Sequence, residues 1–149
     1  MNPLSLNQLA QFAEAVRQNG DGSRMVASLS TDSRTTRPGD LFVALRGDNF
    51  DGHKFVAQAT ERGAVGAVVE KTWTGKPSPD FSLLRVSDTL RGYQQIAAQY
   101  RRSLGLKVIA ITGSNGKTST KDFTASVLGR RFRVTKTEGN FNNHVGLPR

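Results

Sequence analysis

The order of apolar and polar positions in the first 86 residues predicts a small α/β domain, because helical spacing alternates with short, mainly apolar runs. Helical spacing begins after Ser5, a good N-cap, and predicts a helix over residues 5–18. A second helix is expected over residues 53–61, with Phe55 on its buried side. The apolar runs predict strands at residues 25–30, 41–45, 64–69 and 81–86, with a turn at residues 37–40 and a polar loop at residues 47–52.

From residue 87 onward, the pattern predicts longer elements. Ser87-Asp88-Thr89 is a helix-start signal, and the apolar residues behind it recur at intervals of three and four, so we expect a helix of about four turns. Residues 108–111 are continuously apolar and predict a strand buried on both faces of a parallel sheet. A helix to about Leu128 and a strand over residues 133–137 are expected to follow.

These elements divide into two predicted domains, residues 1–86 and residues 87–149. The second contains one strand–helix–strand unit, whereas a doubly wound sheet needs several more strands. We therefore expect residues 87–149 to be the incomplete beginning of a parallel-sheet domain that continues in a longer protein.

A glycine-rich segment lies between the predicted strand at residues 108–111 and the helix that follows it. Such a loop lets successive N–H groups converge on one anion, and the helix N-terminus adds its positive dipole end. We expect Lys117 to contact the β- and γ-phosphates of ATP, and Thr118 or Ser119 to offer a hydroxyl to Mg²⁺. Because Ile111 stands where the full phosphate-loop pattern has its first glycine, an ordinary strand-to-helix turn stays open as the alternative. The expected ATP-binding residues are Gly113, Ser114, Asn115, Gly116, Lys117, Thr118 and Ser119.

The amino-acid composition indicates which kinds of molecule the chain is expected to bind. The formal net charge is +9, but the basic residues are dispersed and do not alternate with aromatic ones, which favours a phosphate-rich small molecule over nucleic acid. No run of 18 apolar residues and no signal-peptide pattern occurs, so no membrane span is expected. The absence of cysteine excludes disulfides and thiolate metal sites and is compatible with the cytoplasm, where we expect the protein to act.

Four stretches carry a resemblance to a known family: T-D-S-R at residues 31–34, P-G-D-L-F-V-A-L-R-G-D-N-F-D-G-H at 38–53, T-G-S-N-G-K-T at 112–118 and T-E-G-N-F-N-N-H-V-G-L-P at 137–148. Together they resemble the Mur ligases, ATP-dependent amide-forming enzymes of peptidoglycan precursor synthesis. The last stretch resembles the member that adds D-alanyl-D-alanine to the UDP-N-acetylmuramoyl tripeptide. The resemblance implies ATP and Mg²⁺ as cofactors, these two small-molecule substrates, and a monomer at full length.

The resemblance also implies roles for single residues. Thr31, Ser33 and Arg34 would bind the uridine diphosphate, since a hydroxyl and a planar guanidinium both suit phosphate oxygens. A turn with a solvated arginine is the alternative for this stretch. Lys117 would stabilise charge during phosphoryl transfer. Further expected contacts are Asp48, Asn49 and Phe50 with the same ligand, and Asn142 and Asn143 with the muramoyl peptide or the ATP phosphates.

Two histidines, His53 and His144, are expected to be structural rather than ligands or bases. The chain is expected to bind but not to catalyse alone. Alternative functions are the sister ligase that adds the third amino acid and a non-catalytic nucleotide-binding module.

Overall fold

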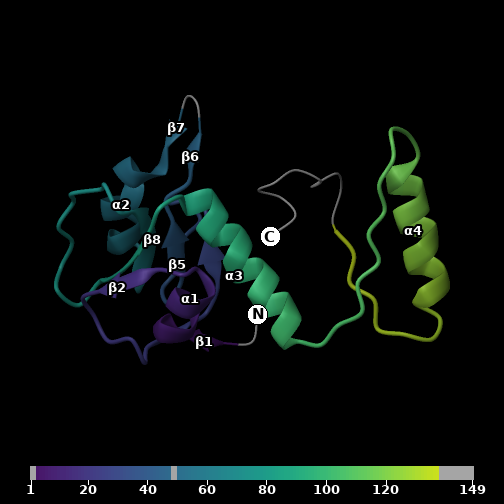
Figure 1. Ribbon diagram of the computed structural model, residues 1–149, viewed down its shortest axis with the longest axis horizontal. Helices are drawn as coiled ribbons and strands as arrows, with labels where there is room; N and C mark the ends of the chain where they lie inside the picture. The colour runs from purple at the N-terminus through teal and green to yellow at the C-terminus, as the bar shows by residue number, and fades with distance from the viewer. Residues whose placement is uncertain (1–2, 48–49, 138–149) are drawn as a thin grey trace. The chain divides into compact units, whose positions relative to one another are not determined.

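The chain consists of two compact units, Met1–Tyr100 and Arg101–Arg149. The computed structural model describes residues 3–47 and 50–137. The first unit holds a mixed α/β core, and the described part of the second holds one complete helix with irregular segments on either side (Figure 1). The domain boundary expected near residue 87 stays a prediction.

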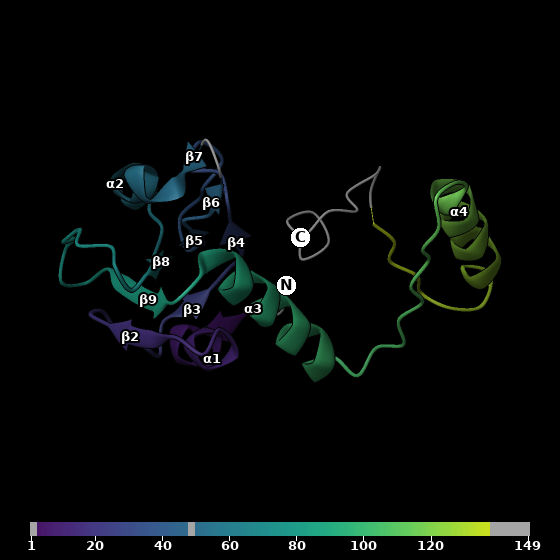
Figure 2. The same cartoon turned by 45° about the horizontal axis from the view of Figure 1, so that its top comes forward.

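Five strands form the central sheet of the first unit: β2 (Val16–Gln18), β4 (Leu29–Ser30), β5 (Leu41–Val43), β8 (Gly66–Glu70) and β9 (Ser82–Val86). Their order in the sheet is β2-β9-β8-β5-β4. Along the series β9-β8-β5-β4 each strand is parallel to the next, and β2 pairs with β9 in the antiparallel direction (Figure 2). The sheet is therefore mostly parallel, as expected of an α/β fold.

Two short antiparallel pairs accompany this sheet: β1 (Leu4–Ser5) with β3 (Met25–Val26), and β6 (Arg46–Gly47) with β7 (Phe50–Asp51). The helices of the first unit are α1 (Leu6–Phe12), the 3-10 helix η1 (Gly52–Phe55), α2 (Val56–Glu61) and most of α3 (Thr89–Ser103). Helix α4 (Lys117–Leu128) belongs to the second unit. Among the described residues, none of these helices combines the length and hydrophobicity that crossing a bilayer requires.

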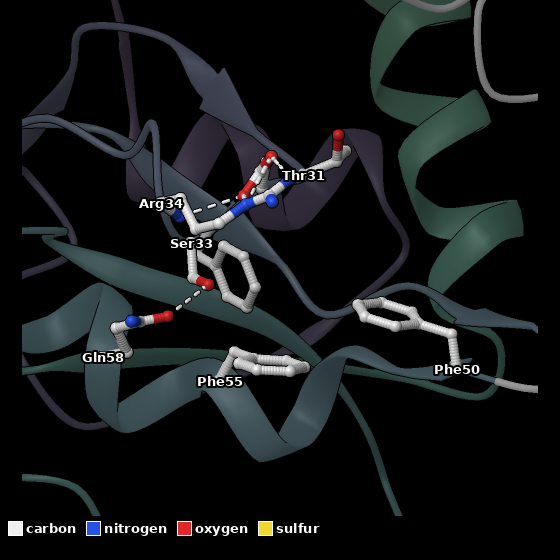
Figure 3. A pocket seen from close by; sticks show the side chains of 8 residues that line it. Thr31, Ser33, Arg34, Phe50, Phe55 and Gln58 are labelled. Atoms are coloured by element: carbon white, nitrogen blue, oxygen red, sulfur yellow. Dashed lines mark hydrogen bonds and ion pairs between the residues drawn. The ribbon is translucent and has the colours of Figure 1, made fainter.

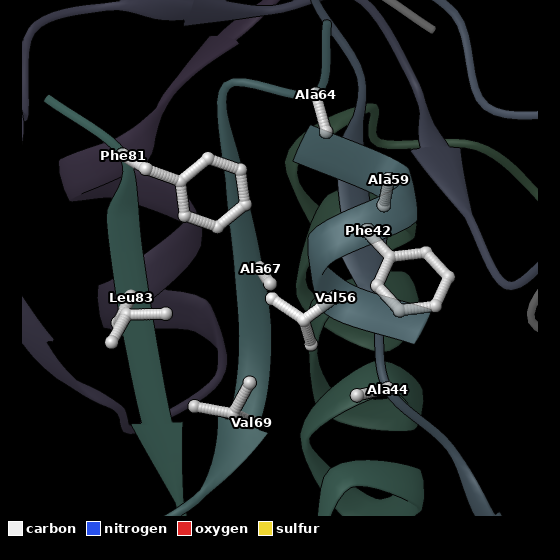
Figure 4. Close-up of a cluster of buried hydrophobic side chains, with 9 residues drawn as sticks. All are labelled: Phe42, Ala44, Val56, Ala59, Ala64, Ala67, Val69, Phe81 and Leu83. Carbon is white, nitrogen blue, oxygen red and sulfur yellow. The ribbon is translucent and has the colours of Figure 1, made fainter. Parts of the chain in front are cut away.

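One face of the central sheet packs against α2 (Figure 4). Phe42 of β5 and Leu83 of β9 face Val56 and Ala59 of that helix, and all four side chains are buried. The complete cluster is Phe42, Ala44, Val56, Ala59, Ala64, Ala67, Val69, Phe81 and Leu83.

The opposite face of the sheet is buried as well. Leu41, Val43 and Leu84 alternate with the residues of the first face and are at most 1% exposed. Helix α3 packs there, since a Cβ added at Gly92 would lie 3.2 Å from a methyl group of Val86. Burial on both faces explains why β5 and β8 coincide with largely apolar runs, whereas β9 also contains Ser82 and the half-buried Arg85. All three strand predictions are confirmed.

The first helix is shorter than the predicted span of residues 5–18. Ser5 does form the expected cap, because its hydroxyl accepts the N–H of Gln8 while Gln8 Oε1 accepts the N–H of Ser5. The helix ends at Phe12, and Glu14 adopts a left-handed φ of 52° that helical geometry does not allow. Val16 fits the helical spacing, but β2 pairs with β9 instead, so the prediction was wrong beyond Phe12.

Residues 25–30 form two strands in different sheets rather than the single strand expected. The chain leaves the first sheet at Ala27, whose N–H donates to Gly39 O at 2.9 Å, and Ser28 Oγ donates to Asp40 Oδ1 at 2.7 Å. Both partners belong to the predicted turn at residues 37–40. Gly39 has a φ of 89°, as the third position of a type II turn requires, so the turn prediction is confirmed.

Two further predictions in the first unit need correction. The described part of residues 47–52 pairs in the β6–β7 hairpin and does not form an irregular loop. The helix expected over residues 53–61 is present as η1 followed by α2, but Phe55 is 36% exposed rather than buried. Phe55 stacks on Phe50 of β7, with ring centroids 5.5 Å apart and planes 12° apart, and this contact replaces the expected contact with the core.

In the second unit, helix α4 is confirmed but the flanking strands are not. Residues 108–111 and 133–137 form no strand, and Val108 and Ile109 are 58% and 62% exposed. A parallel strand needs a neighbour to pair with, and the described residues of this unit supply none. The expected burial of residues 108–111 in a parallel sheet was therefore wrong for the described chain.

Candidate functional site

The T-D-S-R loop follows β4 directly and lies at the carboxyl edge of the parallel sheet. Its shape is fixed by one backbone carbonyl, that of Asp32, which accepts hydrogen bonds from the hydroxyls of Ser30, Thr35 and Thr36 at 3.0, 3.2 and 3.1 Å. The Thr35 N–H donates to the same oxygen at 3.1 Å. Open parallel sheets bind ligands at this edge, so the loop is well placed for a site.

Arg34 and Asp32 form an ion pair within the loop. Arg34 Nη2 donates to Asp32 Oδ2 at 2.7 Å, and Arg34 Nε donates to Asp32 Oδ1 at 2.9 Å. The hydrogen bond from Arg34 lowers the pKa of the Asp32 carboxyl group from its usual 3.8 to about 2. The Arg34 side chain is 79% exposed, so the guanidinium is accessible to a ligand even while one of its edges holds Asp32.

Ser33 points the other way, toward α2. It is buried, and its hydroxyl donates to Gln58 Oε1 at 2.6 Å. This bond joins the loop to the helix across 25 positions of sequence. Its hydroxyl is thus engaged within the protein, whereas the sequence predicts donation to a phosphate.

An open pocket of about 470 Å³ lies between the T-D-S-R loop, the β6–β7 hairpin and the helices η1 and α2 (Figure 3). The stacked rings of Phe50 and Phe55 form one side of it, and Arg34 and Thr31 lie on the other. The lining residues are Thr31, Asp32, Ser33, Arg34, Phe42, Phe50, Phe55 and Gln58.

The pocket brings together four of the residues expected to bind uridine diphosphate, namely Thr31, Ser33, Arg34 and Phe50. Their binding role stays a prediction. Four other expected contacts, Asp48, Asn49, Asn142 and Asn143, lie outside the described residues, as does His144.

Four residues of the pocket were not predicted from sequence. Asp32 stands inside the T-D-S-R motif and had a sequence signal, since a carboxylate two positions before an arginine can pair with it. Gln58, Phe42 and Phe55 had none, because only the tertiary fold brings them to the loop.

The glycine-rich loop in the second unit turns at two glycines into the start of α4, and its phosphate-binding role stays a prediction. Gly113 and Gly116 adopt φ values of 145° and 76°, which favour glycine, and α4 begins directly afterwards at Lys117. Lys117 Nζ folds back and donates to Gly113 O at 2.6 Å.

The donor set of this loop fits a nucleotide with a shared metal ion. Thr118 and Ser119 lie in the first turn of α4 and offer hydroxyl oxygens. Within the described residues no group of three or more acidic, histidine or cysteine side chains could hold a metal by itself. Mg²⁺ is usually held by one or two carboxylates together with substrate phosphates, and a phosphate loop adds a Ser or Thr hydroxyl. The Mg²⁺ role of Thr118 and Ser119 stays a prediction.

Comparison with known proteins gives the chain its family. The model of the Mur ligase family catalytic domain matches residues 25–101, and that of the Mur ligase middle domain matches residues 111–149. The UDP-N-acetylmuramoyl-tripeptide–D-alanyl-D-alanine ligase of Bacillus subtilis (strain 168) is 48% identical over 124 residues, which are 83% of this chain and 27% of that ligase.

Solved structures agree with the sequence comparison. A crystal structure of MurF from Acinetobacter baumannii superposes with a TM-score of 0.89 at 35% identity, covering 99% of this chain and 32% of that one. MurF from Thermotoga maritima, solved in complex with ADP, gives a TM-score of 0.70 at 34% identity over 81% of this chain and 27% of that one. The chain thus spans about a third of the length of the relatives it matches. On the two domain matches and these similarities, the chain belongs to the Mur ligase family.

Proposed function

We propose that the chain is the N-terminal part of an ATP-dependent ligase that adds D-Ala-D-Ala to the UDP-N-acetylmuramoyl tripeptide during peptidoglycan precursor synthesis. The observation that carries the proposal is the pocket, in which an accessible arginine and a stacked aromatic pair face each other across a space of about 470 Å³. The similarity to ligases of this name in Bacillus subtilis and Acinetobacter baumannii supports the choice of substrates. We further propose a cytoplasmic, monomeric full-length enzyme.

The pocket suits the uridine diphosphate end of the precursor. Arg34 presents a planar guanidinium whose free edge can donate to pyrophosphate oxygens, and Asp32 holds its opposite edge in place. Phe50 and Phe55 offer ring faces, on which a planar base such as uracil can stack. Gln58 has its carbonyl engaged by Ser33, which leaves its amide N–H groups as donors for a base carbonyl or phosphate.

The second unit would bind ATP. Backbone N–H groups of residues 113–118 would hold the phosphates at the start of α4, and Lys117 would exchange its bond to Gly113 O for the β- and γ-phosphates. Thr118 or Ser119 would hold Mg²⁺, which neutralises phosphate charge when bound.

The proposed reaction has two steps. The carboxylate of the tripeptide attacks the γ-phosphorus of ATP, which releases ADP and gives an acyl phosphate. The amine of D-Ala-D-Ala then attacks the acyl carbon, loses a proton and displaces inorganic phosphate to leave an amide. Phosphoryl transfer depends mainly on positioning and positive charge, so Lys117 and the loop N–H groups are the contributions this chain can make.

A UDP titration followed by NMR tests the first half of the proposal. We expect UDP to shift the amide resonances of residues 31–34, Phe50 and Gln58. Arg34→Lys should weaken binding although it keeps the charge, because an ammonium lacks the paired, in-plane donors of a guanidinium. Arg24→Lys, at an exposed position away from the pocket, is the matched control. Absence of shifts at the pocket would contradict the assignment.

A further inference from the structure

The β6–β7 hairpin carries Phe50, one of the two stacked rings of the pocket, but it has little support of its own. It contains only two paired residues on each strand and does not join the five-stranded sheet. An isolated two-stranded hairpin is marginally stable at best. The position of Phe50 therefore depends on whatever fastens the hairpin to the rest of the first unit.

His53 is the buried residue that makes this connection. Its side chain is 6% exposed, and it lies in η1, two positions after Asp51 of β7. On one side, His53 Nδ1 lies 2.7 Å from Asp51 Oδ1. On the other side, the backbone N–H of Glu70, the last residue of β8, donates to His53 Nε2 at 2.9 Å. One imidazole ring thus bridges the hairpin and the central sheet.

The two bonds define the state of the ring. Because Nε2 accepts the Glu70 N–H, the neutral imidazole carries its proton on Nδ1, and this N–H donates a hydrogen bond to Asp51. The hydrogen bond from His53 lowers the pKa of the Asp51 carboxyl group, which therefore stays charged. Asp51 Oδ1 also accepts the backbone N–H of His53 at 3.0 Å, so the same carboxylate caps η1.

The other connections of the hairpin are weaker or less specific. Arg46 Nη1 pairs with Glu70 Oε2 at 2.9 Å, but the Arg46 side chain is 58% exposed, and exposed ion pairs contribute little. The Gly52 N–H donates to Leu45 O at 2.8 Å, which closes the hairpin on itself without reaching β8. The two hydrogen bonds of the buried His53 therefore attach the hairpin to the sheet more strongly than these contacts do.

We propose that His53 is a positioning residue, which holds the β6–β7 hairpin on β8 so that Phe50 stacks on Phe55 and completes the base-binding side of the pocket. The part of this inference that concerns the ligand rests on the proposed function. The polar atoms of His53 contact the hairpin and the strand end rather than the aliphatic core. An apolar ring would fill the same space, so the bridge acts through its two hydrogen bonds.

Three variants of the full 149-residue chain separate these contributions. His53→Phe keeps a ring but removes both hydrogen bonds. His53→Gln removes the ring but keeps a carbonyl that can accept the Glu70 N–H and an amide N–H that can donate to Asp51. Arg46→Ala removes only the exposed ion pair. Each is compared with the wild type by UDP titration calorimetry, by the NMR cross-peak between the Phe50 and Phe55 rings, and by thermal unfolding.

The fluorescence of Trp73 adds a local readout. Trp73 is the only tryptophan of the chain, and its ring centroid lies 6.2 Å from that of His53. A change in Trp73 emission without a change in far-ultraviolet circular dichroism would report a rearrangement at His53 in a folded protein.

We expect His53→Phe to lose the ring-to-ring cross-peak and to bind UDP about ten-fold more weakly, since an unpaired buried N–H is left at Glu70. His53→Gln should restore both readouts, and Arg46→Ala should leave them unchanged. If His53→Phe does not fold, His53→Asn replaces it, because asparagine is too short to reach Glu70 and should lose the cross-peak.

Two results would overturn the inference. One is an intact cross-peak together with unchanged UDP affinity in His53→Phe. The other is a His53→Gln variant that lacks the cross-peak or binds UDP more weakly than the wild type. If the wild type does not bind UDP, the proposed function fails instead. The cross-peak between Phe50 and Phe55 would still decide whether His53 positions the hairpin.

Discussion

Phe42 offers the sharpest test of how the first unit is held together. It lies in β5, between β8 and the edge strand β4, is 1% exposed, and contributes to both the core cluster and the pocket wall. Four of the nine residues of its cluster are alanines, which are too short to close a gap. We therefore expect Phe42→Ala to leave a cavity that relaxes little and to fall in the usual range for such a change, about 3–5 kcal/mol.

This loss is large relative to the stability of a domain, which is typically about 5–15 kcal/mol. For a unit of this size it corresponds to a decrease in the unfolding midpoint of roughly 12–40 °C. Urea unfolding followed by circular dichroism measures the free energy directly. Phe123→Ala is the matched control, because Phe123 is 73% exposed and its truncation should cost less than about 0.5 kcal/mol. A loss below about 1 kcal/mol for Phe42→Ala, or equal losses for both variants, would refute the reasoning.

Three further predictions concern the two sites. Lys117→Ala should abolish measurable Mg-ATP binding, because it removes the lysine that the loop directs at its own carbonyls. Lys76→Ala is the control and should leave binding unchanged. Equal affinities of the two variants in titration calorimetry would contradict this prediction. The folded-state pKa of Asp32 is about 2, below its usual 3.8, so the stabilisation from its pairing with Arg34 is present above about pH 4 and is lost as the pH falls toward 2. An NMR titration of the Asp32 carboxyl carbon with a midpoint near 3.8 would disprove the pairing in solution. The 149-residue chain alone should release no phosphate in response to D-Ala-D-Ala, since it spans about a third of its relatives; turnover in a phosphate assay would show that prediction to be wrong.

Strands β5 and β8 could be predicted from sequence because both of their faces are buried. Burial on two sides forces every position to be apolar, and an unbroken run is the simplest pattern to recognise. Val16 shows the limit of this reasoning. Its spacing from α1 fits a helix, and only the pairing of β2 with β9, some 65 positions later, makes it a strand residue.

Pocket residues that are adjacent in sequence could be predicted. Pocket residues that only the tertiary fold brings together could not. Thr31, Ser33 and Arg34 lie in one motif, so the sequence pointed to them together. Gln58 joins them through a bond to Ser33 across 25 positions, and Phe55 turns outward because Phe50 offers a ring to stack on. Such contacts depend on how two elements are aligned with each other. The spacing of residues within one element does not determine that alignment.

The carbonyl of Asp32 has a consequence for how this site can be altered. The T-D-S-R loop keeps its shape through a main-chain oxygen and the three hydroxyls of Ser30, Thr35 and Thr36, all of which flank the positions that face the pocket. Every amino acid possesses that oxygen, so the side chains at positions 31 and 34 are exchangeable without dismantling the loop, whereas the Asp32 side chain also accepts the Arg34 backbone N–H at 2.9 Å. Natural or engineered substitutions at positions 31 and 34 can therefore change which ligand the pocket binds while the loop keeps its backbone conformation.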